Sequence, residues 1–560
     1  MTQDAFTIFH IANELNAIIE NARVERINQP EKDSVTFRIR SNGSNYILTA
    51  CAKAEYARLS LGKNNPTAPI EAPSFCMLLR KHLSNSTIIS VSPVTDERII
   101  KIDFLCKSEL GDLSEKSLYC EIMGKYSNIV LTENGKILGA LKTTSLDSGY
   151  PRHIFAGVTY ALPEKQNKVS VFNENESKSI LKKFNGDDLS DYLFNNFLGL
   201  SMQTAKEIVF RYFKNIKTFN IDDFYSFFKD FYVNPPFCPN AIFSKENGGV
   251  YVFDYETIKD EKKTYSNIYQ AVDEYYFSKI LSNAFSVRKN KLTDAVKAFI
   301  KKQEKKLQIV EEKILSCRDA EKNLLFGQLI ISNLFKIKGG EEYVELNDYT
   351  KDDYPLVKIT LDENKSAKQN AEKYFKKYDK QKKTLSAVTK QKEELEELIS
   401  YLKGIINEIE QTESIEDFAD VDEELKSLGI LKQENKKKEK VKQTSYRHYS
   451  YRGYEIYVGK NNVQNERLTF SADRAVVWLH AKDFHSAHVI IKTNGKPVED
   501  EVLLFAAQIC AYYSDARSVD KVPVDYTLKK YVKKSNGKAI GLVYYTEQKT
   551  LFVTPDAHLN

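Results

Sequence analysis

Two short segments in the first quarter of the chain place charged side chains where a strand is expected to begin or end. Glu97 and Arg98 directly precede the strand-like run 99–104, and Glu121 and Ile122 end another such run. A guanidinium can donate two parallel hydrogen bonds to a phosphate or a base edge, and a carboxylate can accept from a base amino group. The pattern fits a nucleic-acid contact. It also fits a surface Arg–Glu ion pair, whose loss would cost under about 1 kcal/mol.

The second of these segments continues through a glycine into a polar, basic turn. Residues 121–128 read EIMGKYSN, so Lys125 and Asn128 follow the strand end closely. Turns at strand ends present side chains on a rigid scaffold, which is where binding residues concentrate. Lys125 and Asn128 are therefore candidate RNA-binding residues, while an ordinary hairpin remains the alternative.

The C-terminal part of the chain holds the largest group of candidate RNA-binding side chains. Its lysines follow the run 522–526, which we expect to form a turn, and lysines there would meet phosphates without reading sequence. Three histidines lie close in sequence, but their spacing matches no familiar zinc pattern, so we expect no metal ion and no cofactor. Trp478 is predicted to belong to the core. The candidates are Lys460, Asn461, His480, Lys482, His488, Lys529, Lys530, Lys533 and Lys534.

Length and composition predict a multidomain protein without membrane spans. The chain has 560 residues, 42% of them hydrophobic, and a net charge of +5 from 82 basic and 77 acidic groups. The seven cysteines form no C-x-x-C pair, which argues against a zinc site or a disulfide framework. The sequence shows neither a signal-peptide pattern nor an apolar run of about 18 residues. A cytoplasmic protein is expected.

Hydrophobic periodicity predicts four segments that must position these candidates. Residues 1–175 read as an α+β domain with an opening helix and an antiparallel sheet. Residues 176–273 read as short helices around Gly199, which fits either a turn of helix-hairpin-helix type or a plain helix connector. Residues 274–435 show apolar positions at alternating spacings of four and three in two limbs around a mixed cap at about 325–365. Residues 444–560 alternate strands with one helix after a charged linker at 436–442.

The two limbs predict one long antiparallel coiled-coil hairpin. Helices of this length do not bury enough surface alone and need a partner. The nearest partner of each limb is the other limb, and folded sequence lies on both sides of the segment. A coiled coil that dimerises two chains is the alternative, and it would give a stable dimer held by this segment.

Several motifs resemble those of the NFACT family of ribosome quality-control factors. The run EIMGKYSNIVL at 121–131 is similar to a family motif, and so are INQP at 27–30 and FCMLLRKHL at 75–83. In the C-terminal segment, residues 458–465, 478–483 and 522–526 are similar to the family's RNA-binding domain. The family pattern Pro-Gly-Ser-His is replaced by the sequence HSAH at 485–488.

The resemblance implies a fold and a function. The family's first domain resembles formamidopyrimidine DNA glycosylases, but the start MTQ lacks the Pro-Glu that those enzymes use. Family members bind obstructed large ribosomal subunits carrying peptidyl-tRNA, recruit mainly alanyl-tRNA, and extend the stalled peptide with alanine without mRNA, marking it for proteolysis. Implied partners are the large subunit, ribosomal RNA, both tRNAs and a small RqcP-like RNA-binding factor. The ribosome would supply the peptide-bond chemistry, so no enzyme activity and no catalytic residue is expected.

The tRNA-contacting residues implied by the resemblance are Glu97, Arg98, Glu121 and Ile122, with Glu97 standing where the family has aspartate. We expect Arg98→Ala and Glu121→Ala to lose tRNA recruitment while folding and subunit binding stay nearly intact. Two other classes remain as alternatives: a surface fibronectin-binding adhesin, which secretion of the native protein would favour, and a nucleic-acid enzyme of glycosylase type, which lesion cleavage would favour.

Overall fold

The computed structural model describes residues 3–64, 66–107, 111–144, 152–164, 166–186, 188–432, 445–493, 495–535 and 540–558. They form two compact units, Met1–Ser282 and Asn283–Asn560. The charged linker predicted at 436–442 lies outside the described residues. No helix of the described part is long and apolar enough to cross a membrane.

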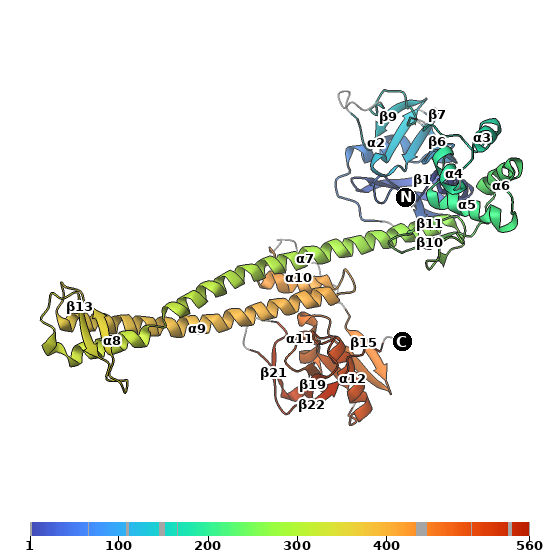
Figure 1. Ribbon diagram of the computed structural model, residues 1–560. Coiled ribbons are helices and arrows are strands. Elements are labelled where there is room, and N and C mark those ends of the chain that lie inside the picture. Colours follow the sequence, from blue (N-terminus) through green and yellow to red (C-terminus); the bar gives the residue numbers. More distant parts are fainter. Residues whose placement is uncertain are drawn as a thin grey trace. The chain divides into compact units, whose positions relative to one another are not determined.

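A nine-stranded antiparallel sheet forms the first part of unit 1 (Figure 1). The sheet order is β4-β3-β2-β1-β5-β6-β7-β8-β9, and α1 (Ala5–Ile19) and α2 (Ser74–Leu83) pack against it. The strands are β1 (Arg23–Glu31), β2 (Ser34–Ser41), β3 (Ser44–Cys51), β4 (Arg58–Gly62), β5 (Thr87–Pro93), β6 (Ile99–Lys107), β7 (Leu113–Glu121), β8 (Asn128–Glu133) and β9 (Lys136–Ala140).

The predicted opening helix is confirmed, and the strand-like runs of the sequence at 35–39, 46–50, 88–91, 99–104, 118–123 and 129–131 correspond to six of these strands. The sequence pattern does not reveal β1, β4 and β9. The sequence of β1, RVERINQPE, carries charges on exposed positions and has no simple alternation, because register shifts interrupt its pairing with β2. The strands β4 and β9 have five residues each, which is too short for periodicity to show.

The second part of unit 1 is helical and shares the hydrophobic core of the sheet. It contains α3 (Glu174–Leu181), α4 (Leu189–Asn196), α5 (Met202–Asn215) and α6 (Ile221–Val233), and a small sheet of β10 (Asn240–Ile242), β11 (Gly249–Tyr251) and β12 (Lys263–Thr264). The ring of Phe6 in α1 lies 5.2 Å from that of Tyr232 and 6.1 Å from that of Phe253. These edge-on aromatic contacts join the first helix to the helical segment.

The turn between α4 and α5 is fixed by the N-terminal segment. Gly199 has a φ of +83°, and a Cβ there would lie 2.7 Å from the Tyr232 hydroxyl. The buried carboxylate of Asp4 accepts the Ser201 N–H at 2.9 Å and the Thr204 hydroxyl at 2.5 Å. The backbone donor that could hold a phosphate at this turn therefore binds a side chain of the same chain.

In unit 2, α7 (Ile268–Ser316), which begins in unit 1, pairs with α9 (Ala367–Gln411), as the sequence predicts. Three cross-contacts show the direction. The Lys289 ammonium donates to the Glu410 carbonyl at 2.7 Å, and the Lys392 ammonium lies 3.1 Å from the Glu311 carboxylate. Farther along, in α8, the Asn323 amide donates to Gln381 at 2.7 Å. As the residue numbers increase along α7 and α8, those of the partners on α9 decrease. The pairing is therefore antiparallel and lies within one chain.

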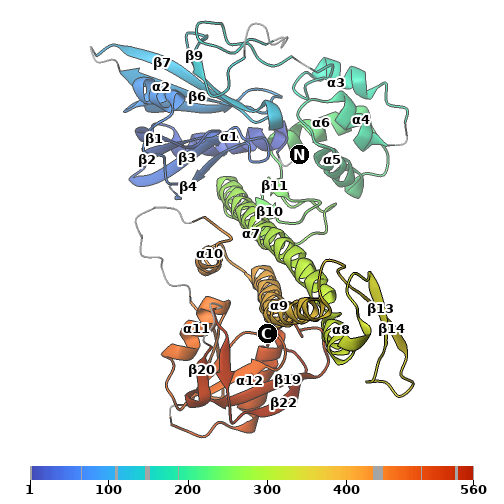
Figure 2. The ribbon, with the colours of Figure 1, turned by 90° about the vertical axis from the view of Figure 1, so that its left-hand side faces the viewer.

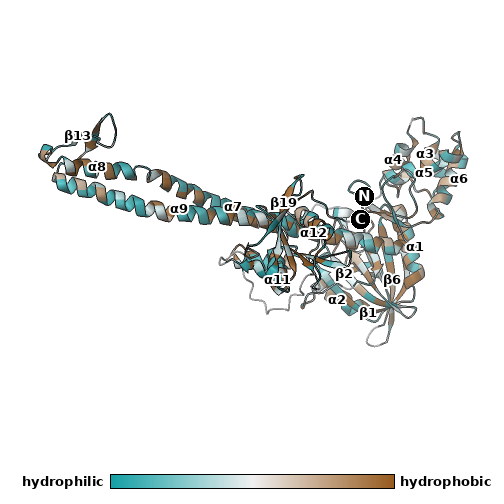
Figure 3. Cartoon of the chain, turned by 90° about the horizontal axis from the view of Figure 1, so that it is seen from below, coloured by the Kyte–Doolittle hydropathy of each residue, from teal (hydrophilic) through white to brown (hydrophobic). Residues whose placement is uncertain are grey.

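The seam between the limbs is apolar inside and polar outside. Leu292, Val296 and Ile300 pack with Ile399 and Leu402, and Gln303 fills one turn of the seam at 3% exposure. The outer surface of both helices is mostly hydrophilic in Figure 3. This is the two-faced pattern that a helix pair in water requires.

A small cap closes the far end of the hairpin (Figure 1). It consists of α8 (Ala320–Ser332), a 3₁₀ turn η2 (Leu334–Lys336) and a hairpin of β13 (Tyr343–Asn347) and β14 (Leu356–Thr360). Gly339 and Gly340, between η2 and β13, have φ of +88° and +84°. After the hairpin, α10 (Phe418–Ser427) folds back onto α9.

The C-terminal domain is a six-stranded antiparallel sheet of order β15-β16-β18-β17-β19-β22 (Figure 2). α12 (Asp500–Tyr512) packs on one face and α11 (Asn462–Ser471) on the other. The strands are β15 (Arg447–Tyr451), β16 (Tyr454–Val458), β17 (Val477–Ala481), β18 (Val489–Lys492), β19 (Val522–Leu528) and β22 (Lys549–Val553). A separate pair, β20 (Val532–Lys534) and β21 (Val543–Tyr545), follows the 3₁₀ turn η3 (Lys529–Tyr531).

The prediction of a turn at 522–526 is wrong. These residues belong to β19, where Val522 and Val524 are fully buried and pair with Val553 and Leu551. The proline suggested a turn, but the carbonyl of Pro523 accepts the Lys482 N–H at 2.9 Å, so the residue contributes to strand pairing. The prediction that Trp478 belongs to the core is confirmed, since its side chain is fully buried.

The hairpin seam gives a direct test of the fold. Leu402 is fully buried between α7 and α10, so Leu402→Ala should lower the free energy of unfolding of unit 2 by about 2–5 kcal/mol. Ile309 lies on the same hairpin at 53% exposure, and Ile309→Ala should change it by less than about 0.5 kcal/mol. Thermal melts of the full chain followed by circular dichroism measure both. Equal effects, or a dimeric mass in light scattering that Leu402→Ala abolishes, would contradict an intramolecular seam.

Candidate functional site

The structure brings the two charged segments of the first domain together at one end of neighbouring strands. Ile99 of β6 pairs directly with Glu121 of β7, and the Ile122 N–H donates to the Arg98 carbonyl at 2.7 Å. Arg98 is half-buried, and burial lowers the pKa of its guanidinium against the opposing effect of Asp4 and Glu97. The residue pairs singled out from the sequence therefore lie side by side.

Glu121 is bound within the domain. Its carboxylate is 1% exposed, and both of its oxygens accept from the Arg152 guanidinium, with Nη1 at 3.0 Å from Oε2. The Tyr160 hydroxyl donates to Oε1 at 2.9 Å, and the Tyr160 ring stacks on Tyr119 with centroids 4.0 Å apart. Burial and the Glu121 charge both raise the pKa of Tyr160. Glu121 thus fixes the segment after residue 151 against β7.

The turn after Glu121 is also built from its own motif residues. Gly124 adopts a φ of +59° in the 3₁₀ turn Gly124–Tyr126, and the Ser127 hydroxyl accepts the Met123 N–H at 2.8 Å. The buried Asn128 side chain accepts the Lys142 N–H at 2.9 Å and donates to its carbonyl at 2.8 Å. Lys125 remains exposed at the tip of the turn. Asn128 positions the backbone here, and Lys125 faces solvent.

In the C-terminal domain, Lys460 and Asn461 face α10 of the hairpin base. The Lys460 ammonium lies 3.0 Å from the Asp417 carboxylate, and its side chain is 17% exposed. Asn461 caps α11 by accepting the Gln464 N–H at 2.8 Å. The buried Asp420 carboxylate accepts from the Gln464 amide at 3.2 Å. Acidic groups are favourable at the N-terminus of a helix, so this contact stabilises docking of α10 on α11.

The next turn of α10 adds a buried carboxyl to the same interface. Glu424 is fully buried and accepts from the Tyr401 hydroxyl and, at 3.0 Å, from the Asn462 amide. The Tyr401 hydroxyl in turn accepts the Ile540 N–H at 2.9 Å. Burial raises the pKa of Glu424 to about 7, and burial and Glu424 together raise that of Glu408. Hydrogen bonds across this interface join the hairpin base and the C-terminal sheet domain in unit 2.

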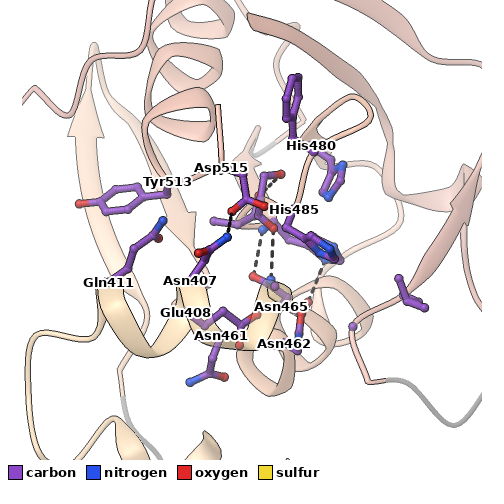
Figure 4. Close-up of a pocket in the computed structure, with 18 of the residues that line it drawn as sticks. Asn407, Glu408, Gln411, Asn461, Asn462, Asn465, His480, His485, Tyr513 and Asp515 are labelled. Atoms are coloured by element: carbon purple, nitrogen blue, oxygen red, sulfur yellow. Dashed lines mark hydrogen bonds between the residues drawn. The ribbon is translucent and has the colours of Figure 1, made fainter. Parts of the chain in front are cut away.

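A polar cavity of about 480 Å³ lies beside this interface (Figure 4). One wall comes from α9, where Glu408 and Asn407 project toward the domain, and Asn407 donates to the Asp515 carboxylate at 2.6 Å. His485 packs on Gly404, where a Cβ would lie 2.7 Å from its Nδ1. The altered sequence at 485–488 therefore matches a glycine on the facing helix. Residues of the other wall that Figure 4 labels are Asn461, Asn462, Asn465, His480, His485 and Tyr513.

The two candidate histidines serve mainly the interior. His488 is buried, and its Nδ1 lies 2.8 Å from the Thr469 hydroxyl. His480 stacks parallel to Trp478 with centroids 5.7 Å apart. Burial lowers the pKa of His480 to about 4 and lowers that of His488 well below its usual value. In the described part of the chain, no group of three or more His, Cys, Asp or Glu side chains could hold a metal ion.

The lysines after β19 form the exposed basic part of the domain. Lys530 and Lys533 are exposed, and so is Lys482 on the neighbouring loop. Lys529 is half-buried, with its ammonium 5.5 Å from the centroid of the Phe470 ring. Lys534 pairs with Glu466 at 2.7 Å. Of the C-terminal lysines predicted from sequence, Lys482, Lys529, Lys530, Lys533 and Lys534 lie where a phosphate can reach them.

Sequence reasoning missed the residues that hold the candidates in place. Arg152 lies in irregular chain without periodicity, and the acids of α10 belong to no motif. The spacing of Asp417, Asp420 and Glu424, at intervals of three and four, places them on one helix face and was the available signal. Acidic residues on one helix face do not predict a buried contact unless the basic or amide partner is also known.

The ion pair of Glu121 changes one expectation from the sequence, that Glu121→Ala leaves folding nearly intact. Removing one member of a buried pair leaves the other charge uncompensated. Glu121→Ala should therefore destabilise unit 1 by about 3–5 kcal/mol. Arg152→Ala should have a similar effect, and the double variant should cost much less than the sum of the two. Lys125→Ala, at an exposed position of the following turn, is the control in thermal melts. A wild-type melting temperature for Glu121→Ala would show that the Glu121–Arg152 ion pair does not stabilise unit 1.

The buried carboxyl of Glu424 makes the stability of unit 2 depend on pH. Its pKa is raised from 4.5 to about 7, so its stabilising contribution is present below about pH 4.5 and is lost as pH rises through 7. Glu424→Gln should remove this loss. We expect the variant to be more stable than the wild type at pH 8, by on the order of 1–3 kcal/mol. At pH 5 the two proteins should melt at nearly the same temperature.

Other groups titrate in the same range, so wild type and variant are compared at each pH. Lowered histidine pKa values act in the opposite direction, because their contribution is present above about pH 6.5 and is lost as pH falls through the folded-state pKa. Glu423→Gln changes an exposed carboxyl on the same helix and is the matched control. If the Glu424→Gln and wild-type melting curves shift in parallel between pH 5 and 8, the carboxyl does not couple docking to pH.

Known proteins resemble the chain along its whole length. It is 33% identical to the "Rqc2 homolog RqcH" of Bacillus subtilis (strain 168), covering 100% of this chain and 98% of that protein. It is 30% identical to the protein of the same name from Streptococcus pneumoniae serotype 2 (strain D39 / NCTC 7466), with the same coverage. Among solved structures, the N-terminal part of the fibronectin/fibrinogen-binding protein of Streptococcus suis is 26% identical over 49% of this chain and 99% of that chain, with a TM-score of 0.43.

Two family models match the chain along most of its length. The model described as "NFACT N-terminal and middle domains" matches residues 4–444. The model described as "NFACT protein RNA binding domain" matches residues 443–543, which include most of the sheet domain and its exposed lysines. The first match alone spans well over half of the sequence. The chain belongs to the NFACT family.

Proposed function

We propose that this protein acts in ribosome-associated quality control. It binds obstructed large ribosomal subunits carrying peptidyl-tRNA, recruits alanyl-tRNA, and directs mRNA-independent alanine tailing of the stalled chain, which marks it for proteolysis. The observation that carries this proposal is the match to RqcH relatives over 100% of the chain and 98% of theirs. A match that omits no large segment favours a shared role for the whole molecule rather than for one module.

We assign tRNA contact to the end of β6 and β7, with Arg98 as the direct contact. A half-buried guanidinium beside acidic neighbours has its fork orientation restricted, which favours bidentate recognition of a phosphate or base edge. Glu97 lies in the adjoining turn. Glu121 and Ile122 position this end of the sheet, because one binds Arg152 and the other binds the Arg98 backbone.

We assign ribosomal RNA contact to the exposed lysines of the C-terminal domain, with Lys125 as a further contact in the first domain. Lys482, Lys530 and Lys533 lie on the surface of the C-terminal domain, where their ammonium groups can meet phosphates. Lys460, Asn461, Asn128, His480 and His488 then act from within, by holding the elements that carry these contacts. This division follows from burial and from the hydrogen bonds described above.

The domain boundaries, location and partner predicted from the sequence belong to the same proposal. We assign residues 1–175 to a glycosylase-like domain, 176–273 to a helix-hairpin-helix domain, 274–435 to the hairpin and 444–560 to the RNA-binding domain. The positive φ of Gly199 between α4 and α5 supports the second assignment. The protein would act as a non-catalytic tRNA-recruiting factor in the cytoplasm, with a small RqcP-like RNA-binding partner.

Arg98 provides the test of tRNA recruitment. Arg98→Ala should reduce tRNA co-purification and alanine tailing by roughly 5- to 150-fold, because a bidentate contact is worth about 1–3 kcal/mol. Arg98→Lys keeps the charge but loses the fork, and it should not restore either signal. The readouts are tRNA bound to affinity-purified protein from cells with stalled translation, and the C-terminal mass of a stalled reporter.

Two measurements make this result interpretable. Co-sedimentation with large subunits should stay near wild type, because the C-terminal domain supplies that contact. Arg26→Ala removes an exposed arginine of the same sheet and should leave tRNA binding and tails unchanged. Normal alanine tails from Arg98→Ala would show that this end of the sheet does not recruit tRNA. Failure of the wild type to bind large subunits would overturn the proposed function as a whole.

A further inference from the structure

A second cavity of about 540 Å³ opens on the C-terminal sheet, on the face that carries α11. Its floor is apolar, with Leu468, Val476 and Ile490 exposed by 5%, 7% and 1%. These residues pack with Trp478, which is fully buried. The cavity therefore has a flat hydrophobic base built from neighbouring strands and one helix.

Aromatic side chains form the walls of this cavity. Tyr446 and Tyr457 are both half-buried and pack against the floor cluster. Tyr457 is flanked by His448, with ring centroids 4.9 Å apart, and by the Lys492 ammonium, 4.6 Å from its ring centroid. Rings held between neighbours in this way offer a preformed stacking surface at little entropic cost.

Polar groups form the rim, and they are connected to the basic surface. The Lys529 N–H donates to the Val476 carbonyl at 2.9 Å, and the Lys530 N–H donates to the Arg474 carbonyl at 3.1 Å. These two bonds attach the turn η3, with its lysines, directly to the segment that borders the cavity. Asp473 on the rim accepts the Ala475 N–H through Oδ1 at 2.9 Å. Its second carboxylate oxygen can accept from an exocyclic amino group.

We propose that this cavity binds an unpaired nucleobase of single-stranded RNA whose phosphates lie on Lys529, Lys530 and Lys533. The base takes the place of the Lys492 ammonium over the Tyr457 ring and stacks there above the apolar floor, and the displaced ammonium pairs with a phosphate. The inference rests on the proposed RNA-binding function of this domain and adds to it a site that contacts a base. Proteins that bind single strands combine a basic track with aromatic platforms, and both occur here in one connected structure.

The charge around the cavity favours RNA over an apolar peptide as the occupant. Lys492, Arg474 and Lys496 are exposed at or beside the rim, and the lysines of η3 are joined to the bordering segment through their backbone N–H groups. A peptide side chain would bury the floor equally well but would gain nothing from this row of cations. A base brings its own phosphate to them.

The single tryptophan of the chain gives a direct readout. Trp478 packs with the cavity floor, so a base entering the cavity should quench or shift its emission. The probe is a cytidine octamer, titrated into the full chain and followed by Trp478 emission and by anisotropy of a labelled oligomer. We expect Tyr457→Leu to weaken binding about 5- to 100-fold, the range for losing one stacked base, without changing the salt dependence. Tyr457→Phe keeps the ring and should bind as the wild type does.

Matched variants separate the base site from general RNA binding. Replacing Lys529, Lys530 and Lys533 with Ala should weaken binding and flatten its salt dependence, because each lysine that no longer neutralises a phosphate lowers the slope by roughly 0.7. Phe552→Leu removes an exposed ring at the opposite edge of the sheet and should have no effect. An RNA duplex should bind Tyr457→Leu and the wild type equally, because its bases are not available for stacking.

The outcomes distinguish this inference from the function on which it rests. If the lysine variant loses the octamer while Tyr457→Leu keeps wild-type affinity, RNA binding stands and the base site is overturned. Unchanged Trp478 emission on saturation with the octamer also overturns the base site. If the wild type binds neither the octamer nor large subunits, the proposed function itself fails. Circular dichroism melts of each variant show that the domain remains folded.

Discussion

The second unit depends on the burial of an apolar seam between two helices that are not stable alone. α7 and α9 have 49 and 45 residues, and most of their side chains are polar. Only the side chains that recur at spacings of four and three residues are shielded from water. Their burial requires the two helices to pair antiparallel in the correct register. The cross-contacts of Lys289, Lys392 and Asn323 fix that register. The cap lies at one end of this seam, and α10 packs on it at the other end.

The docking of α10 extends this constraint to the C-terminal sheet. Three acidic groups at intervals of three and four meet Lys460, Gln464 and Asn462 around the start of α11. Such an interface is stable only while its buried carboxyls are paired or protonated. Its consequence is that some of the basic and amide side chains of the domain's motifs are directed inward. The lysines after β19 stay exposed or half-exposed, and together with the second cavity they are the RNA contacts proposed for this domain.

In both parts of the molecule for which RNA contact is proposed, the recognisable motif residues build a scaffold and other charged residues lie beside them. Glu121 and Asn128 bind protein groups, while Arg98 and Lys125 lie nearby at a turn or strand end. His488 and Asn461 are buried, while Lys530 and Lys533 are exposed. The physical reason is common to both. A flexible charged side chain recognises a partner well only if the backbone that carries it is fixed, and fixing that backbone requires buried polar groups with satisfied hydrogen bonds.

Much of the secondary structure could be predicted because local patterns determine it. The seam spacing predicted the hairpin, and strand-like runs predicted most strands of the first sheet. The failures were local patterns that a distant contact overrides. The run 522–526 became a strand because β17 and β22 pair with it on both sides, despite its proline. The short strands β4 and β9 were missed because five residues carry too little periodicity.

The candidate residues could be chosen from sequence by chemical type, but their tasks could not. The sequence determined that Arg98 and Glu121 lie near strand ends, that four C-terminal lysines gather between residues 529 and 534, and that Trp478 belongs inside. Only the tertiary structure decided that Glu121 meets Arg152, that Lys460 meets Asp417, and that Tyr446 and Tyr457 enclose a cavity with Lys492. Each of these pairs joins residues far apart in the chain. Whether a charge faces solvent or a buried partner depends on which segment packs over it, and that is a property of the folded chain.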